Sequence, residues 1–139
     1  MITIEIINGP IAFFPNNNYD QETGSELIFN GRVRSTENGK PIVALEYEQY
    51  EGMAKSELIQ LAEETSKKFP IDNLFCKHRI GRVGVGETSL HVVILSHHRK
   101  EGLEGMSWFI KELKKRIPIW KWAVLEDGTR IPSNCVQEH

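Results

Sequence analysis

Two stretches of this chain repeat apolar residues at the three- and four-residue spacing of an α-helix, and each stretch ends at a proline. Apolar residues at this spacing share one helical face, and a proline cannot continue the helix. The pattern therefore predicts two amphipathic helices. The first stretch carries Ala54, Leu58, Leu61, Ala62, Thr65 and Phe69 before Pro70. The second covers about residues 100–116 and carries Leu103, Met106, Ile110, Leu113 and Ile117 before Pro118.

The segments around these helices have strand character. They are residues 3–7, 26–33, 42–50, 73–80, 88–96 and 120–125. Asn38-Gly39 is a hairpin-type dipeptide. The glycine-rich residues 81–86 lie between two strands, so they favour a hairpin turn over a phosphate loop. Residues 14–25, with three consecutive asparagines, predict a loop. From residue 42 the order of strands and helices predicts an α+β fold, with two helices packed on a largely antiparallel sheet and residues 1–139 as one domain.

Composition narrows the class of protein. The formal net charge of −2 argues against a general nucleic-acid binder. The chain has no apolar run of the roughly 20 residues that a bilayer span requires, and its first residues lack the layout of a signal peptide. Cys76 and Cys135 form no motif, which favours a reducing cytosol. We therefore expect a cytoplasmic protein without a nucleic-acid or membrane partner.

Basic residues gather at three places. Arg32 and Arg34 lie at a strand end, where two guanidiniums can hold a phosphate; the alternative is a solvated pair of arginines. His98 and Arg99 precede the second helix, whose free N–H groups also attract anions. A zinc site at the adjacent histidines is not favoured, because neighbouring strand residues point apart and no ligand pair completes the set.

The third basic cluster spans residues 114–121. Lysines near a helix C-terminus, such as Lys114 and Lys115, interact favourably with the helix dipole. Lys121 lies between Trp120 and Trp122, where desolvation would lower its pKa and make it a candidate nucleophile, acid or base. Its alternative role is that of an edge-strand lysine. Taken alone, the three clusters predict a small α+β protein with a cationic pocket for an anionic ligand.

Several motifs in order resemble a known family, the molybdopterin synthase large (catalytic) subunits. Residues 29–34 (FNGRVR) resemble its F-x-G-x-V-R motif, and residues 45–53 its L-x-Y-E-x-Y-x-x-M segment. Residues 78–81 (HRIG) and 85–87 (VGE), the pair His98-Arg99, and residues 114–121 match further motifs. The resemblance covers about residues 26–121 and implies an α/β-hammerhead fold.

This resemblance implies a sulfurtransferase. The reaction moves sulfur from the C-terminal Gly-Gly thiocarboxylate of a small ubiquitin-like subunit to cyclic pyranopterin monophosphate, which forms the molybdopterin dithiolene. The implied assembly is a homodimer of large subunits within a heterotetramer, with no metal or other cofactor bound to this chain. Lys114 and Lys121 match the catalytic lysines. The residues implied to bind substrate are Arg32, Val33, Arg34, His98, Arg99, Lys114, Lys121 and Trp122.

One departure from the family concerns Ala123, which stands where relatives carry a glutamate. The alternatives to an enzyme are a non-catalytic pterin- or anion-binding module and a scaffold that docks a ubiquitin-like partner. Loss of turnover on replacement of Lys114 would distinguish the enzyme from the binding module. A scaffold would bind the tail regardless of whether it ends in carboxylate or thiocarboxylate.

Overall fold

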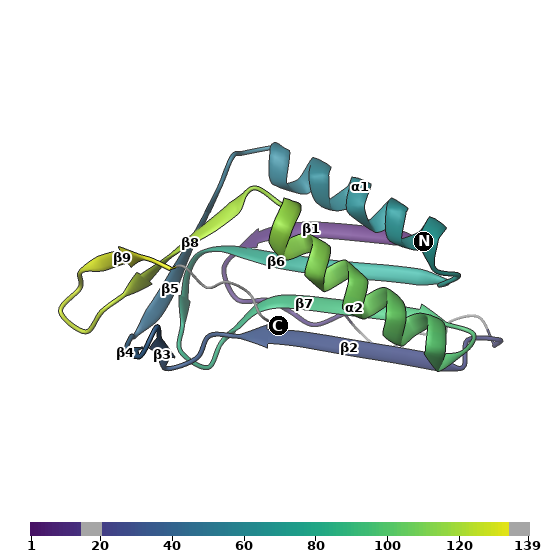
Figure 1. The fold of residues 1–139 in the computed structure, drawn as a ribbon, viewed down its shortest axis with the longest axis horizontal. Helices are drawn as coiled ribbons and strands as arrows, with labels where there is room; N and C mark the ends of the chain where they lie inside the picture. The colour runs from purple at the N-terminus through teal and green to yellow at the C-terminus, as the bar shows by residue number, and fades with distance from the viewer. Residues whose placement is uncertain (15–20, 134–139) are drawn as a thin grey trace.

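The computed structural model describes residues 1–14 and 21–133, arranged as two helices on a mostly antiparallel sheet (Figure 1). The predicted asparagine loop and Cys135 lie partly or wholly outside these residues. The predicted α+β class is confirmed. The elements in chain order are β1 (Ile2–Asn8), β2 (Ser25–Arg32), β3 (Thr36–Glu37), β4 (Lys40–Pro41), β5 (Ala44–Gln49), α1 (Met53–Lys68), β6 (Asn73–Gly84), β7 (Thr88–Ser96), α2 (Arg99–Arg116), β8 (Ile119–Val124) and β9 (Arg130–Pro132).

The long strand β6 joins two parts of the sheet. Its first part lies between β7, which is antiparallel, and β1, which is parallel. Its last residues pair instead with β5, which continues the sheet through β8 to β9. Gly81, at φ 84°, begins this second part. Position 81 therefore favours glycine, because other residues pay a steric cost at positive φ.

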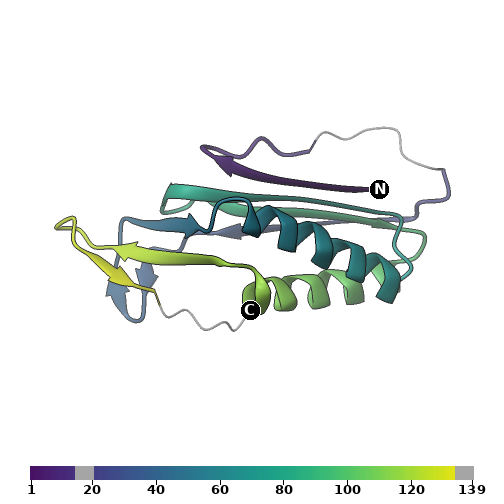
Figure 2. The same cartoon turned by 90° about the horizontal axis from the view of Figure 1, so that it is seen from above.

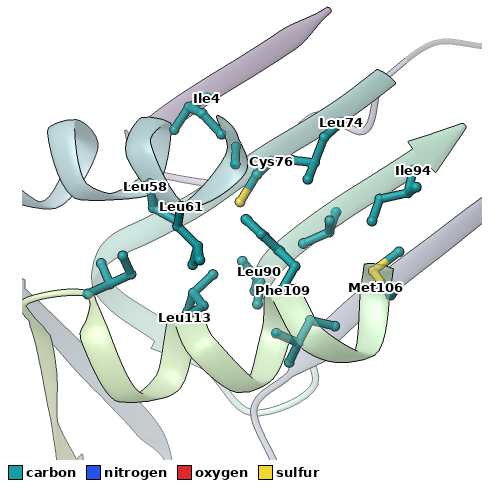
Figure 3. Packing of buried hydrophobic residues seen from close by; sticks show 14 of the residues in the cluster. Ile4, Leu58, Leu61, Leu74, Cys76, Leu90, Ile94, Met106, Phe109 and Leu113 are labelled. Atoms are coloured by element: carbon teal, nitrogen blue, oxygen red, sulfur yellow. The ribbon is translucent and has the colours of Figure 1, made fainter. Parts of the chain in front are cut away.

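The two helices lie side by side on one face of the sheet (Figures 1 and 2). Their apolar stripes meet the inward-facing residues of the sheet in one core, in which a fully buried Leu or Phe side chain contributes about 1.5–3 kcal/mol. Figure 3 shows this packing, in which the labelled residues are Ile4, Leu58, Leu61, Leu74, Cys76, Leu90, Ile94, Met106, Phe109 and Leu113. A second, smaller core lies under β5 and β8, with Val33, Ile42, Leu45, Tyr47, Val83 and Ala123.

The predicted stripe of α2 needs a correction at Leu103. This side chain is 54% exposed, whereas Phe109 is completely buried. Near its start the helix turns Gly102 toward the sheet and Gly105 toward Phe69 and Ile71. A Cβ at Gly102 would lie 2.9 Å from the Ser96 hydroxyl oxygen, so this turn of the helix approaches the sheet too closely for a side chain. Leu103 is consequently turned toward solvent.

The bounds of some strands and turns differ by a few residues from those predicted from the sequence. The strand β6 extends to Gly84, so the turn before β7 is shorter than the predicted glycine-rich segment and covers residues 85–87. The Asn38-Gly39 dipeptide forms the predicted hairpin, with φ 52° and 79°, between β3 and β4. The strand β9 carries no sequence signal that predicted it. In the described part of the chain, neither helix has the length and apolar character needed to cross a membrane.

Candidate functional site

A pocket of about 260 Å³ lies where the end of α2 meets the sheet, between the two cores. Residues of β2, β5, β7 and β8 line it together with the last turn of α2. Four of the predicted site residues line this pocket: Arg32, Arg34, Lys114 and Lys121. The structure thus brings together two of the three basic clusters, which the sequence separates by about eighty positions.

Lys114 and Lys121 line the same pocket because the chain reverses direction between them. The helix α2 ends at Arg116, and the backbone turns at Ile117 before β8 starts. Lys121 then pairs with Tyr47 of β5, which also lines the pocket. Lys114 is exposed and Lys121 is half-buried. Two ammonium groups on opposite sides of this reversal can therefore act on one bound molecule.

The two arginines are held differently. The Nε and Nη2 atoms of Arg32 donate to the carbonyl oxygen of Gly86, at 3.1 and 2.8 Å. Arg34 has a 73% exposed side chain, and its Nη2 lies 4.0 Å from the Glu37 carboxylate. Arg32 is thus fixed at the pocket by two hydrogen bonds, whereas Arg34 makes a loose ion pair.

Val33 is a core residue, and its expected role in substrate binding stays a prediction. Its side chain is buried in the smaller core. Its N–H donates to the Glu87 carbonyl at 3.1 Å, and its carbonyl accepts from the Gly86 N–H at 2.8 Å. The side chain and both backbone groups are therefore already engaged within the fold.

Trp122 lies on the face of β8 opposite to Lys121, since successive strand residues point to opposite faces. Its Nε1 donates to Glu48 at 3.1 Å, as does that of Trp120 at 3.0 Å. These two bonds lower the pKa of the Glu48 carboxyl. Arg130 stacks over the Trp122 ring at 4.6 Å. Neither indole lines the pocket, so within one copy of the chain the structure places Trp122 outside it, and its contact with substrate stays a prediction.

His98 and Arg99 are exposed at the start of α2 and do not line the pocket. Arg99 precedes Lys114 by fifteen positions, which corresponds to about 22 Å along a helix. His98 is the N-cap residue, and its carbonyl accepts a bond from the Ser96 hydroxyl at 2.6 Å. Within one copy of the chain, His98 and Arg99 therefore lie outside the pocket that contains Lys114 and Lys121.

The adjacent His97 is engaged by an acidic side chain. Its Nδ1 lies 3.0 Å from the Asp72 carboxylate. Among residues 1–14 and 21–133, no group of three or more His, Cys, Asp or Glu side chains is placed to hold a metal ion.

Sequence reasoning missed a carboxylate in the pocket. Glu37 is only 5% exposed, accepts a hydrogen bond from the Ser133 hydroxyl and lines the pocket beside Arg34. Nothing in the local sequence marks it, because an acidic residue before Asn-Gly is typical of an exposed turn. Ala123, the expected departure from the family pattern, is completely buried in the smaller core.

A second missed residue is His78, which lies beneath the two lysines. It is 4% exposed, its Nδ1 donates to the Arg79 carbonyl at 2.9 Å, and its ring meets Tyr47 edge-on at 5.6 Å. The pKa of His78 is lowered to about 4, chiefly by burial and also by the charges of Lys114 and Lys121, while the Arg79 bond opposes the shift. A neutral imidazole therefore supports the cationic pocket at neutral pH.

Comparisons with known proteins agree with this architecture. The sequence profile described as MoaE protein matches residues 11–116. The molybdopterin synthase catalytic subunit of Pyrococcus abyssi is 40% identical over 106 residues, which cover 76% of this chain and 72% of that protein. The chain belongs to the MoaE family of molybdopterin synthase catalytic subunits.

Solved structures related to this MoaE chain share its fold. The crystal structure of molybdopterin synthase from Staphylococcus aureus matches with a TM-score of 0.80 and 29% identity, over 91% of this chain and 93% of that one. A complex of subunits 1 and 2 of the molybdopterin-converting factor from Helicobacter pylori matches with a TM-score of 0.74 and 23% identity, over 97% and 92%. The expected family and fold are thus confirmed for this chain.

Proposed function

We propose that this MoaE chain transfers sulfur from the C-terminal thiocarboxylate of a small ubiquitin-like subunit to cyclic pyranopterin monophosphate, forming the molybdopterin dithiolene. The observation that carries the proposal is the convergence of Arg32, Arg34, Lys114 and Lys121 on one pocket. Both reactants are anions, one through its thiocarboxylate and the other through its phosphate. Fixed positive groups lower the energy of bound anions and of negative charge that develops during acyl transfer.

In each round of the proposed reaction, the thiocarboxylate sulfur displaces an oxygen substituent from a carbon of the pterin side chain and gives a thioester. Water then hydrolyses this thioester, so that the sulfur stays on the pterin and the tail leaves as a carboxylate. Lys114 positions the thiocarboxylate and stabilises the tetrahedral oxyanion that forms when water adds to the acyl carbon; the C–S bond breaks as this oxyanion collapses to the carboxylate. Lys121 stabilises charge or transfers a proton at the pterin. Arg32 and Arg34 hold the phosphate through charge-assisted hydrogen bonds.

We also propose that the working unit contains two copies of this chain, each paired with one small subunit. The Helicobacter pylori relative is a complex of two different subunits. His98 and Arg99 lie too far along α2 from Lys114 to serve the same pocket in one copy. A second copy would have to supply them if they bind substrate. Mixing a Lys114→Ala chain with a His98→Ala, Arg99→Ala chain tests this arrangement, because only mixed dimers then hold one intact pocket.

The cytoplasm is the proposed location, and residues 1–139 the proposed extent of one domain. The free thiol of Cys76 is consistent with a reducing compartment.

The experiment that tests the function is a reconstitution with purified chain, thiocarboxylated small subunit and cyclic pyranopterin. Lys114→Ala should abolish most dithiolene formation. Lys115→Ala is the matched control, because Lys115 is the next residue of the same helix, pairs with Glu112 at 3.5 Å and does not line the pocket. No product from the wild-type chain, beside an active synthase as positive control, would refute the catalytic proposal and leave a binding module or a docking scaffold.

A further inference from the structure

We propose that Arg79 and Glu87 are positioning residues that fix the guanidinium of Arg32 in the cationic pocket through the turn at residues 85–87. Neither Arg79 nor Glu87 lines the pocket. The inference rests on the proposed role of this pocket as an anion site. It assigns a role to two family motifs, HRIG and VGE, that the reaction itself does not use.

The first link joins Arg79 to the turn. Oε1 of Glu87 accepts bonds from Nη1 of Arg79 at 3.2 Å and from the backbone N–H of Gly84 at 2.8 Å. The Glu87 N–H in turn donates to the Gly84 carbonyl at 3.0 Å. The Gly84 bond and the Arg79 charge lower the pKa of the Glu87 carboxyl. The ionised side chain of Glu87 therefore closes the turn on itself and ties it to β6.

The second link joins the turn to Arg32. Two backbone bonds with Val33 hold Gly86 and Glu87 against the end of β2. Gly86 has φ +86°, a conformation that other residues adopt at a cost. Its carbonyl oxygen accepts both bonds of the Arg32 guanidinium. These bonds use two of the five N–H groups of Arg32, and the other three are the ones that a phosphate oxygen can use.

Electrostatics explain why Arg32 needs such an anchor. Arg34, Lys114 and Lys121 line the same pocket, and like charges at this range repel one another. An unanchored arginine on a flexible stem would turn away into solvent while the pocket is empty. The Gly86 carbonyl holds the guanidinium in place before the anion arrives, so less conformational freedom is lost on binding.

The burial of Arg79 favours this role over simple stabilisation. Its side chain is 9% exposed, its Nη2 donates to the Arg82 carbonyl at 3.0 Å, and its Nε has no partner among the described residues. Removing the Arg79 charge from water is costly. Its partner Glu87 has a 52% exposed side chain, so solvent screens the ion pair, which adds little net stability. What the Arg79 guanidinium does supply is a fixed direction for Glu87 and hence for the turn.

A double-mutant cycle on phosphate affinity tests the inference. Inorganic phosphate is titrated calorimetrically into the wild-type chain and the variants Glu87→Gln, Arg32→Ala and Glu87→Gln with Arg32→Ala. We expect each single variant to weaken binding roughly tenfold, as for loss of one charge-assisted hydrogen bond, and the double variant to be no weaker than Arg32→Ala. Arg82→Met is the matched control, since Arg82 lies on β6 like Arg79 and its exposed side chain pairs with Glu46 of β5; it should bind like wild type.

The outcomes separate this inference from the proposed function. Additive losses in the double variant, unchanged affinity in folded Glu87→Gln, or no phosphate binding by wild type would each overturn it. Arg79→Lys, which keeps the charge but loses the guanidinium fork, provides a second variant if Glu87→Gln does not fold. In the reconstituted enzyme, Glu87→Gln should raise KM for the pyranopterin and leave kcat unchanged. A chain that makes no product but shows the non-additive cycle refutes the synthase proposal alone.

Discussion

Acidification should destabilise this protein through His78, beneath the pocket. Its pKa is about 4 in the folded chain, against an ordinary value of 6.5. Between these two pH values the unfolded chain binds a proton that the folded chain does not. Stability therefore rises with pH across this window, is fully present above about pH 6.5 and is lost as pH falls toward 4.

The size of the effect follows from the two pKa values of His78. A tenfold change in proton affinity corresponds to about 1.4 kcal/mol, so the full pKa shift of His78 corresponds to about 3 kcal/mol of unfolding free energy. Integrated to pH 5, the loss is about 2 kcal/mol. Burial is the principal cause, and the 4% exposure of His78 leaves little solvent to screen it.

The assay is urea unfolding of the wild-type chain and of His78→Gln between pH 7.5 and 4.5. Glutamine keeps an N–H donor for the Arg79 carbonyl but does not titrate. His91, whose pKa burial and Lys77 also lower, contributes equally to both proteins and cancels in the difference. The unfolding free energy of His78→Gln minus that of the wild-type chain should be about 2 kcal/mol more favourable to the variant at pH 5 than at pH 7.5. Parallel stability curves for the two proteins would refute the reasoning.

Three further predictions concern residues whose place the structure decides. Phe109→Ala should cost about 3–5 kcal/mol of unfolding free energy, because it empties a fully buried site, whereas Leu103→Ala should cost less than about 0.5 kcal/mol; chemical denaturation measures both. Trp122→Phe removes an indole N–H from the face opposite the lysines, so the reconstituted reaction should keep its rate; a large loss would place this face in the mechanism. Gly24→Ala brings a Cβ to 2.5 Å from the His97 carbonyl oxygen, and thermal unfolding should show about 1–3 kcal/mol of destabilisation from the forced backbone shift.

Local sequence patterns predicted the elements well. The two apolar stripes, their terminal prolines and the Asn38-Gly39 dipeptide act over a few residues, so α1, α2 and the hairpin follow without knowledge of the rest of the chain. The predicted stripe of α2 failed at Leu103 because Gly102 lies against Ser96 of β7. That contact joins α2 to a neighbouring strand, and a periodicity within the helix does not report it.

The sequence by itself determined that the chain is α+β, that it carries three basic clusters, and, through its ordered motifs, that it resembles molybdopterin synthase catalytic subunits. Tertiary structure decided which of these residues share a pocket. Strand alternation defines two faces but not which face meets the pocket, so Lys121 lines it and Trp122 does not. Helix length separates Arg99 from Lys114. Glu37 and His78 reach the site through chain reversals and strand pairing between distant segments, which leave no local mark in the sequence.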